Sequence, residues 1–142
     1  MWLLNVHTYE LREFIMNGSG TDRPLYTILS HTWEGEEVLF KDMFDLEGAR
    51  QKLGWRKIEY MCRQTITDGY DWTWIDTCCI DKSSSAELSE AINSMFLWYQ
   101  GAEICHVYLS DARNDGVPGA LVTDATRRHA AFRRCRWWAR GW

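Results

Sequence analysis

Leu25–Ser30 reads LYTILS, a short and mostly apolar run that decides the fold we predict for this chain. Turn-forming residues precede it at 17–24 (NGSGTDRP), and His31 follows it. An apolar run bounded by turn signals is typical of a buried strand. Two further runs have the same character, Trp72–Thr77 (WTWIDT) and Glu103–Leu109 (EICHVYL), and we expect each of them to be a strand.

Two helices are predicted between these strands. From Trp55 to Thr67 one helical face is mostly apolar and carries Ile58, Met61, Cys62, Thr65 and Ile66. Gly69 is expected to end this helix. Ser84 and Glu87 have the spacing of a capping box, which predicts a second helix that ends at Gly101.

Three weaker patterns complete the predicted elements. The stretch 2–6 (WLLNV) is expected to form a first strand, Val38–Phe44 a short helical turn, and 123–136 a helix. The alternation of strand and helix from Leu25 onward is typical of an α/β domain, in which a parallel sheet has helices on its faces. With 142 residues the chain has the length of a single domain.

Polar side chains follow each of the three predicted strands of this sheet. They are Ser30 and His31 after the first, Asp76 with Asp81 and Lys82 after the second, and Ser110 with Asp111 after the third. Ligands of parallel sheets bind beyond the carboxyl ends of the strands. If the strands are adjacent, these side chains line one edge of the sheet, and the sequence predicts a ligand site there.

The net charge of −4 conceals two parts of opposite sign. The stretch 127–142 holds six arginines and no acid, so the rest of the chain has 10 basic and 20 acidic residues, a net charge of −10. Arginine clustered with tryptophan is typical of protein interfaces and of nucleic-acid contacts. The acidic remainder and the lack of a recognisable motif argue against nucleic acid, leaving a protein partner or a helix that packs on the domain.

Other patterns exclude further classes. No apolar run approaches the roughly 18 residues that a membrane span needs, so no membrane partner is expected. The five cysteines lack the spacing of metal ligands, so no metal site is expected. Cys78 and Cys79 lie in an apolar stretch, as buried thiols in a reducing compartment do. We therefore expect a cytoplasmic protein.

Three blocks of this sequence resemble, in order, those of the fungal heterokaryon-incompatibility (HET) domain. They are Tyr26–Trp33 (YTILSHTW), Trp74–Lys82 (WIDTCCIDK) and Arg140–Trp142 (RGW). The second block matches throughout, whereas the first has Glu34 at the position of a family glycine. In the family the third block continues into T-x-Q-E, and here it stops at Trp142.

The resemblance implies a single HET domain over residues 1–142. Its well-matched core covers 1–112, a variable insertion covers 113–131, and the start of the third motif covers 132–142. HET domains are in turn similar to the Toll/interleukin-receptor (TIR) fold. The resemblance therefore implies a flavodoxin-like, TIR-like three-layer fold with a mostly parallel sheet, whose C-terminal part is incomplete here.

The resemblance also implies a role in fungal non-self recognition, in which such domains act as effectors of programmed cell death. In TIR domains that cleave NAD, a glutamate shortly after the third-block tryptophan is catalytic. The matching position lies beyond Trp142, so the resemblance assigns no catalytic residue to this chain. It implies no bound cofactor, and NAD enters only as a substrate of full-length relatives.

Cleavage of the nicotinamide–ribose bond passes through an oxocarbenium-like state, which a nearby carboxylate stabilises. The chemistry also requires an aromatic wall for the flat ring and cations for the phosphates. Residues of these types gather after the predicted strands. The candidate ligand-site residues are therefore Ser30, His31, Trp33, Asp76, Asp81 and Lys82.

Each candidate also has a structural interpretation. Ser30 and His31 can satisfy backbone groups where a strand ends, and Asp76 can hold a loop by hydrogen bonds. Trp33 can be a packing residue, and Asp81 with Lys82 a solvated ion pair. A Cys–His nucleophile is opposed by the apolar surroundings of the thiols, which raise a thiol's pKa. The alternative function is a non-catalytic module that acts by self-association or with other signalling proteins.

Overall fold

The computed structural model describes residues 1–15, 23–111, 133 and 135–139. Most of the predicted turn at 17–24, the insertion at 113–131, most of the predicted helix at 123–136 and the third block at 140–142 lie outside the described residues. The chain divides into two compact units, Met1–Ser30 with Glu34–His106, and His31–Trp33 with Val107–Trp142.

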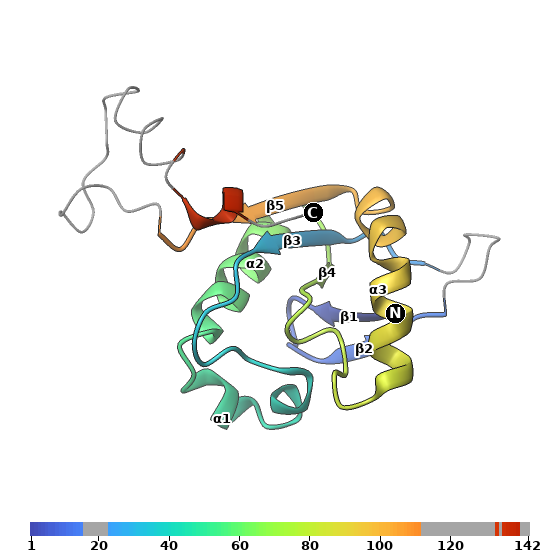
Figure 1. The fold of residues 1–142 in the computed structure, drawn as a ribbon, viewed down its shortest axis with the longest axis horizontal. Helices are drawn as coiled ribbons and strands as arrows, with labels where there is room; N and C mark the ends of the chain where they lie inside the picture. The colour runs from blue at the N-terminus through green and yellow to red at the C-terminus, as the bar shows by residue number, and fades with distance from the viewer. Residues whose placement is uncertain (16–22, 112–132, 134, 140–142) are drawn as a thin grey trace. The chain divides into compact units, whose positions relative to one another are not determined.

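Five strands form one sheet in the order β2-β1-β4-β3-β5 (Figure 1). Their bounds are Trp2–Asn5 for β1, Leu11–Glu13 for β2, Thr27–His31 for β3, Trp72–Trp74 for β4 and Ile104–Tyr108 for β5. β3 pairs with β4 in parallel, whereas β1 is antiparallel to both β2 and β4. The α/β class is confirmed, but the sheet is mixed. The expectation of a mostly parallel sheet was wrong for the part that contains β1 and β2.

The antiparallel side of the sheet arises from a hairpin that the sequence pattern did not show. A short connection can join only antiparallel strands. Asn5 Oδ1 organises the turn by accepting the backbone N–H groups of His7 and Thr8, each at 3.0 Å. Tyr9 adopts φ 60°, and its N–H donates to Asn5 O at 2.9 Å. The three-residue β2 is too short for a visible alternation of apolar and polar side chains.

The two long helices are confirmed. α2 spans Trp55–Thr67 and α3 spans Ser85–Gln100. Ser84 Oγ accepts the Glu87 N–H at 3.3 Å, as the capping box predicts, but Glu87 Oε1 instead accepts Trp2 Nε1–H at 2.6 Å. The predicted helical turn is the 3-10 helix η1, Phe40–Phe44, and two elements not predicted are α1, Leu46–Arg50, and the 3-10 helix η2, Arg136–Ala139.

α2 and α3 cover opposite faces of the β3–β4 pair. Thr27 Oγ1 lies 2.6 Å from Thr65 Oγ1 in α2 and donates to Thr73 Oγ1 at 3.1 Å. Trp74, the next residue in β4, points to the other face, where its ring lies 5.5 Å from that of Trp98 in α3. Three layers therefore pack around these two strands.

This arrangement creates a topological switch point at one end of the strand pair. The chain passes from β3 to α2 on one face and from β4 to α3 on the other. The two connecting loops therefore part at the carboxyl ends of adjacent parallel strands. In open α/β sheets, ligands bind where loops part in this way.

Gly54, just before α2, allows the start of that helix to approach the loop after β3. Its N–H donates to Glu36 O at 3.1 Å. A Cβ at this position would lie 2.9 Å from both Glu36 O and Glu37 Cα. Both atoms belong to the backbone, so they cannot rotate away as a flexible side chain can.

We therefore expect Gly54→Ala to lower the free energy of unfolding by about 1–3 kcal/mol, as other overpacked sites do. Gly35→Ala is the matched control, because nothing lies within 4 Å of a Cβ there, and its effect should stay within about 0.5 kcal/mol. Urea denaturation followed by circular dichroism measures both. Equal stability of the two variants would contradict the close approach.

Candidate functional site

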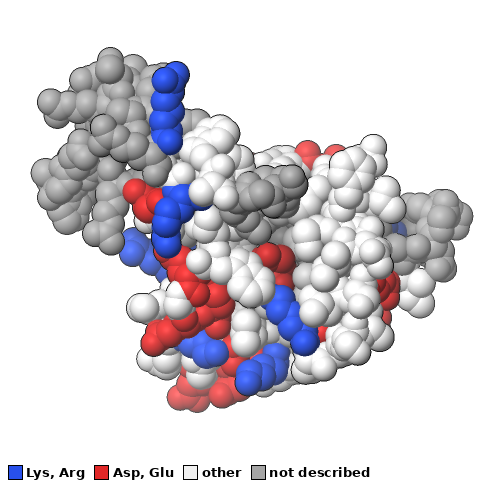
Figure 2. Space-filling model, viewed as in Figure 1, with Lys and Arg blue, Asp and Glu red and all other residues white. Residues whose placement is uncertain are grey.

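The described surface is rich in charges of both signs. On the face shown in Figure 2, acidic side chains gather in the lower part of the molecule, with basic side chains among them. In the part of the chain that the structure describes, no group of three or more His, Cys, Asp or Glu side chains could hold a metal ion. No helix in that part is long and apolar enough to cross a membrane.

A pocket of about 210 Å³ lies between the loops that follow β3 and β4. The connection after β3 contributes Leu39 and the first two residues of η1, Phe40 and Lys41. The loop after β4 contributes Thr77, Ile80, Asp81, Lys82 and Ser83. The pocket thus lies between the two loops that part at the ends of β3 and β4. We call it the switch-point pocket.

The loop after β4 is folded around the backbone of Ile75. Its carbonyl accepts the N–H groups of Cys78 and Cys79 at 3.2 and 2.8 Å. Its own N–H donates to Cys79 Sγ at 3.4 Å. The hydrogen bond to Cys79, together with burial, raises the pKa of the Cys78 thiol well above its usual value. Cys78 is therefore protonated at neutral pH, which opposes its use as a nucleophile.

Asp81 has a clear local role in the same loop. Its Oδ1 accepts the Ser83 N–H at 2.9 Å and the Ser83 hydroxyl at 2.6 Å. These hydrogen bonds, that of the hydroxyl first, hold the pKa of Asp81 below its usual value. The carboxylate is thus ionised and shapes the turn before α3, while the residue also lines the switch-point pocket.

Lys82 is half-buried in the pocket wall. Burial lowers the pKa of its ammonium group, and the negative charges of Asp76 and Glu37 act in the opposite direction. Asp76 is 9% exposed and does not line the pocket. Its carboxylate therefore lies within electrostatic reach of Lys82 from a buried position.

Thr77 brings a buried polar group to the pocket wall. The residue is 1% exposed, and its Oγ1 has no hydrogen-bond partner among the described residues. A buried hydroxyl without a partner costs free energy. A ligand that offers a hydrogen bond to Thr77 would remove that cost.

The first block places its candidates differently. Ser30, at 2% exposure, is buried at the end of β3. His31 is fully buried, with Nδ1 3.2 Å from Thr32 O, and Trp33 is 49% exposed. His31 and Trp33 belong to the second compact unit. Of the six candidates, Asp81 and Lys82 line the switch-point pocket, and Asp76 shares their loop.

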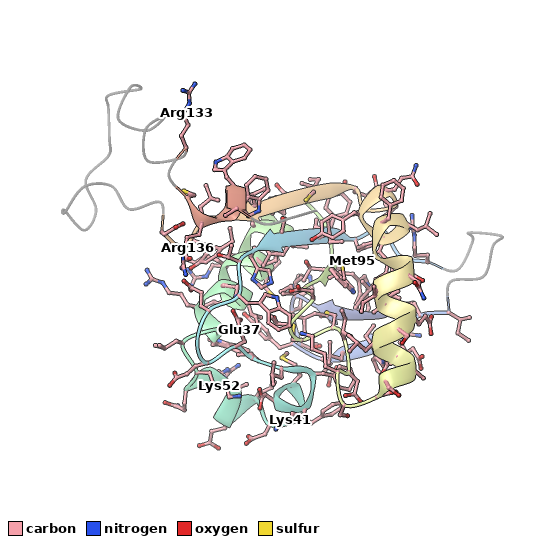
Figure 3. The ribbon with its side chains drawn as sticks, in the orientation of Figure 1. Glu37, Lys41, Lys52, Met95, Arg133 and Arg136 are labelled. Carbon is pink, nitrogen blue, oxygen red and sulfur yellow. The ribbon has the colours of Figure 1, made fainter. Side chains whose placement is uncertain are left out.

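A buried ion pair beside this pocket was missed by the sequence reasoning. Lys57 Nζ donates to Glu37 Oε1 at 2.6 Å, and the two side chains are only 4% and 7% exposed. Glu37 Oε1 also accepts the Glu34 N–H at 2.7 Å, while its Oε2 has no hydrogen-bond partner among the described residues. Figure 3 labels Glu37 on the loop that follows β3 and Lys41 on the adjoining helix η1.

One signal in the sequence could have revealed this pair. Lys57 lies four residues before Met61 and eight before Thr65, so it falls on the buried face of α2. A lysine on an apolar helix face needs an acidic partner, because an unpaired buried charge is costly. The identity of that partner, in a loop twenty residues earlier, could not have been read from spacing.

Removing one member of this ion pair should destabilise the fold, because the remaining charge stays buried. We expect Lys57→Met to lower the free energy of unfolding by about 3–5 kcal/mol, because it leaves a buried carboxylate uncompensated. Adding Glu37→Gln to that variant should restore part of the loss. A double-mutant cycle by urea denaturation measures the coupling, and additive single effects would show that the two groups do not interact.

Comparison with known proteins confirms the resemblance to the HET domain, and the match of the family model ends before the third block at 140–142. The family model described as "Heterokaryon incompatibility protein (HET)" matches residues 26–136. Vegetative incompatibility protein HET-E-1 of Podospora anserina is 48% identical over 124 residues, which cover 84% of this chain and 9% of that relative. No solved structure matches the chain. The chain belongs to the heterokaryon-incompatibility (HET) family.

Proposed function

We propose that this chain is a module of fungal non-self recognition that promotes programmed cell death, and that it acts on a nucleotide such as NAD bound at the switch-point pocket. The observation that carries the proposal is the position of this pocket between the loops after β3 and β4, with Lys41 and Lys82 in its wall. Family membership and the likeness to HET-E-1 support the biological role.

The lining of the pocket suits a phosphate group. Lys41 and Lys82 are its two cations, and Thr77 adds a hydroxyl. α3 begins at Ser85, two residues after Ser83, so the positive end of its dipole adds to the favourable field. A volume of about 210 Å³ is below the ~300–1,000 Å³ of typical small-molecule sites. The pocket therefore fits the phosphate part of a dinucleotide, whose remainder would extend outside it.

The chemistry we propose is TIR-like cleavage of the nicotinamide–ribose bond. The bond breaks with its electron pair leaving on the pyridinium nitrogen, so the leaving group needs no proton. Water adds to the ribose carbon and loses one proton to the solvent, which leaves a hydroxyl there. A carboxylate that stabilises the oxocarbenium charge would suffice. Asp76 is the acid that we assign, because its charge acts on Lys82 and it lies on the loop that lines the pocket.

The proposed compartment is the cytoplasm. All five cysteines lie in the part of the chain that the structure describes and none of them forms a disulfide bond, including the exposed Cys105. Exposed thiols persist where the surroundings are reducing. This supports the compartment expected from the sequence, in which NAD is also available.

A second candidate function is self-association without chemistry. α3 presents Ile92, Phe96 and Leu97 to solvent at 62%, 76% and 61% exposure. Three large apolar side chains within six residues are typical of a contact surface.

A second copy would pair its α3 against this face, and Phe96→Ser should then abolish a concentration-dependent dimer detected by light scattering. A wild-type chain that stays monomeric at high concentration would contradict this candidate.

Nucleotide binding can be tested directly on the pocket lysine. We expect NAD to bind the 142-residue chain and Lys82→Met to weaken binding about tenfold or more, the loss expected for a hydrogen bond between charged groups. Isothermal titration calorimetry measures the affinity, and chromatography of the nucleotide measures cleavage. Arg63→Met is the matched control, because Arg63 is exposed on α2 and pairs only with Glu59 in the described part of the chain. Equal affinities of the wild type and Lys82→Met would overturn the site.

The pH dependence of binding provides a second test. Lys82 carries its charge below its pKa and loses it as the pH rises through that value. Burial lowers this pKa. The nucleotide affinity should therefore begin to fall at a lower pH than it would if the lysine had its ordinary pKa. Lys82→Arg should remove this fall, since a guanidinium stays charged throughout. An unchanged pH profile in Lys82→Arg would exclude Lys82 as the phosphate-binding cation.

A further inference from the structure

The outer edge of β2 offers unpaired backbone groups. β2 ends the strand order, and among the described strands it pairs with β1 alone. Met1 and Phe14 exchange both backbone hydrogen bonds, at 3.0 and 2.8 Å. Since hydrogen-bonded pairs alternate along an antiparallel ladder, Leu11 and Glu13 form non-hydrogen-bonded pairs with β1. Their N–H and C=O groups therefore point away from the sheet.

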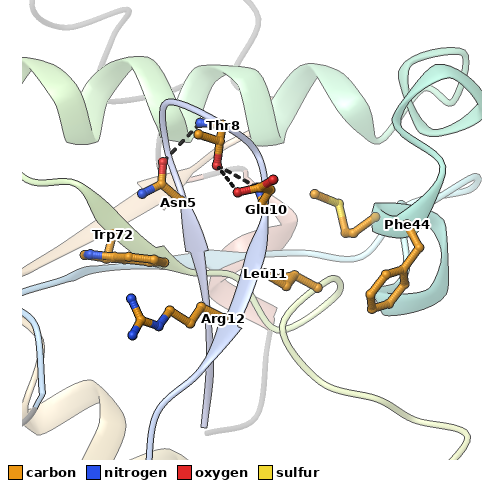
Figure 4. A pocket seen from close by; sticks show the side chains of 8 residues that line it. Asn5, Thr8, Glu10, Leu11, Arg12, Phe44 and Trp72 are labelled. Carbon is orange, nitrogen blue, oxygen red and sulfur yellow. Dashed lines mark hydrogen bonds between the residues drawn. The ribbon is translucent and has the colours of Figure 1, made fainter.

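A second pocket, of about 540 Å³, surrounds this edge (Figure 4). Its lining residues are Asn5, Thr8, Glu10, Leu11, Arg12, Met43, Phe44 and Trp72. In Figure 4, Arg12 and Leu11 leave β2 on opposite sides, Arg12 toward Trp72 and Leu11 toward Phe44. The edge therefore has one wall on each face of the strand.

The wall on the Arg12 side holds three hydrogen-bond donors, and the carboxylate of Glu10 lines the same pocket. Arg12 pairs with Leu3 across the ladder, and Asn5, two residues on, pairs with Trp72, so their side chains share one face. The Asn5 Oδ1 already accepts two backbone N–H groups, which leaves its Nδ2 as a donor. The described residues contain no acidic partner for Arg12 and no acceptor for Trp72 Nε1.

The wall on the Leu11 side is apolar. Leu11, Met43 and Phe44 form it, and the Phe44 side chain is 71% exposed. An exposed phenylalanine beside a half-buried leucine provides a contact for another apolar side chain. An extended strand laid along β2 would direct alternate side chains to the two walls.

We propose that the β2 edge binds an extended peptide segment of a partner protein, in which apolar and acidic residues alternate. Backbone hydrogen bonds to Leu11 and Glu13 supply the pairing, the apolar side chains contact Phe44, and the acidic ones contact Arg12. This proposal is independent of the switch-point pocket. Charged residues also protect edge strands from unwanted pairing, but protection alone does not require a pocket that follows both faces of the strand.

Charge distinguishes this occupant from two others. A second copy paired through all four outward backbone groups would place Arg12 directly opposite the partner's Arg12, and like charges opposite one another are destabilising. A free phosphate would meet Glu10, which lines the same pocket. A side-chain carboxylate carries less negative charge and can approach Arg12 from the edge, away from Glu10.

The test uses the 142-residue chain and a fluorescein-labelled peptide of sequence SVDVDVS. Fluorescence anisotropy should show saturable binding in the micromolar range, and Arg12→Glu should weaken it about tenfold or more. The peptide SVKVKVS should show the reverse preference, binding Arg12→Glu better than the wild type. Arg63→Glu serves as the control, and thermal unfolding followed by circular dichroism confirms that each variant folds.

Two further measurements separate strand pairing from simple charge attraction. N-methylation of the valine amides should abolish binding, because it removes donors without changing charge. Phe44→Ser should weaken the binding of SVDVDVS to the chain with Arg12 and the binding of SVKVKVS to the Arg12→Glu variant. Absence of binding to the wild type, equal binding of the N-methylated peptide, or failure of the charge reversal would overturn the proposal. A dimer of the chain that Glu13→Pro dissociates would assign the edge to a second copy instead, and would also overturn it.

Discussion

The parallel pairing of β3 with β4 is the constraint on which the rest of the structure depends. Their register brings the hydroxyls of Thr27 and Thr73 together next to Thr65 of α2, and it turns Trp74 toward Trp98 of α3. Parallel neighbours cannot be joined by a hairpin, so the chain must leave the sheet between them and return. With one helix on each face, the loops part at the ends of the strands, and the switch-point pocket results.

The loop after β3 is held by a buried ion pair in addition to the buried side chain of Val38. A well-packed apolar pair can stabilise a fold equally well, so stability alone does not account for Glu37 and Lys57. An ion pair differs from an apolar pair because its hydrogen bonds are directional and its charges act on neighbouring groups. Glu37 Oε1 accepts from both Lys57 and the Glu34 N–H, which fixes the course of the loop. The same carboxylate acts on the pKa of Lys82, so the group that shapes the loop also sets the field at the pocket.

Sequence reasoning located the elements with strong local signals and missed those that depend on tertiary contacts. The apolar periodicity of α2 predicted both of its ends, and Ser84 marked the start of α3. β2 was not predicted, because three residues are too few to show an alternation of apolar and polar side chains. Its pairing also depends on the turn at Asn5. The partner of Lys57 was not predicted, because an ion pair between distant segments produces no characteristic residue spacing. Asp81 and Lys82 were placed at the pocket because a parallel sheet directs the loops after its strands to one edge.

The short helix η1 joins the two pockets that the proposals concern. Phe40 and Lys41 line the switch-point pocket, while Met43 and Phe44 line the pocket at the β2 edge. Both pairs belong to the five residues of η1, so a displacement of this helix as a unit would move both. The ion pair of Asp42 with Lys52, at 2.6 Å, fixes the same turn to the chain that follows α1. A ligand that displaces η1 at one pocket therefore changes the lining of the other, and because linkage is reciprocal, the change in binding free energy is the same in both directions.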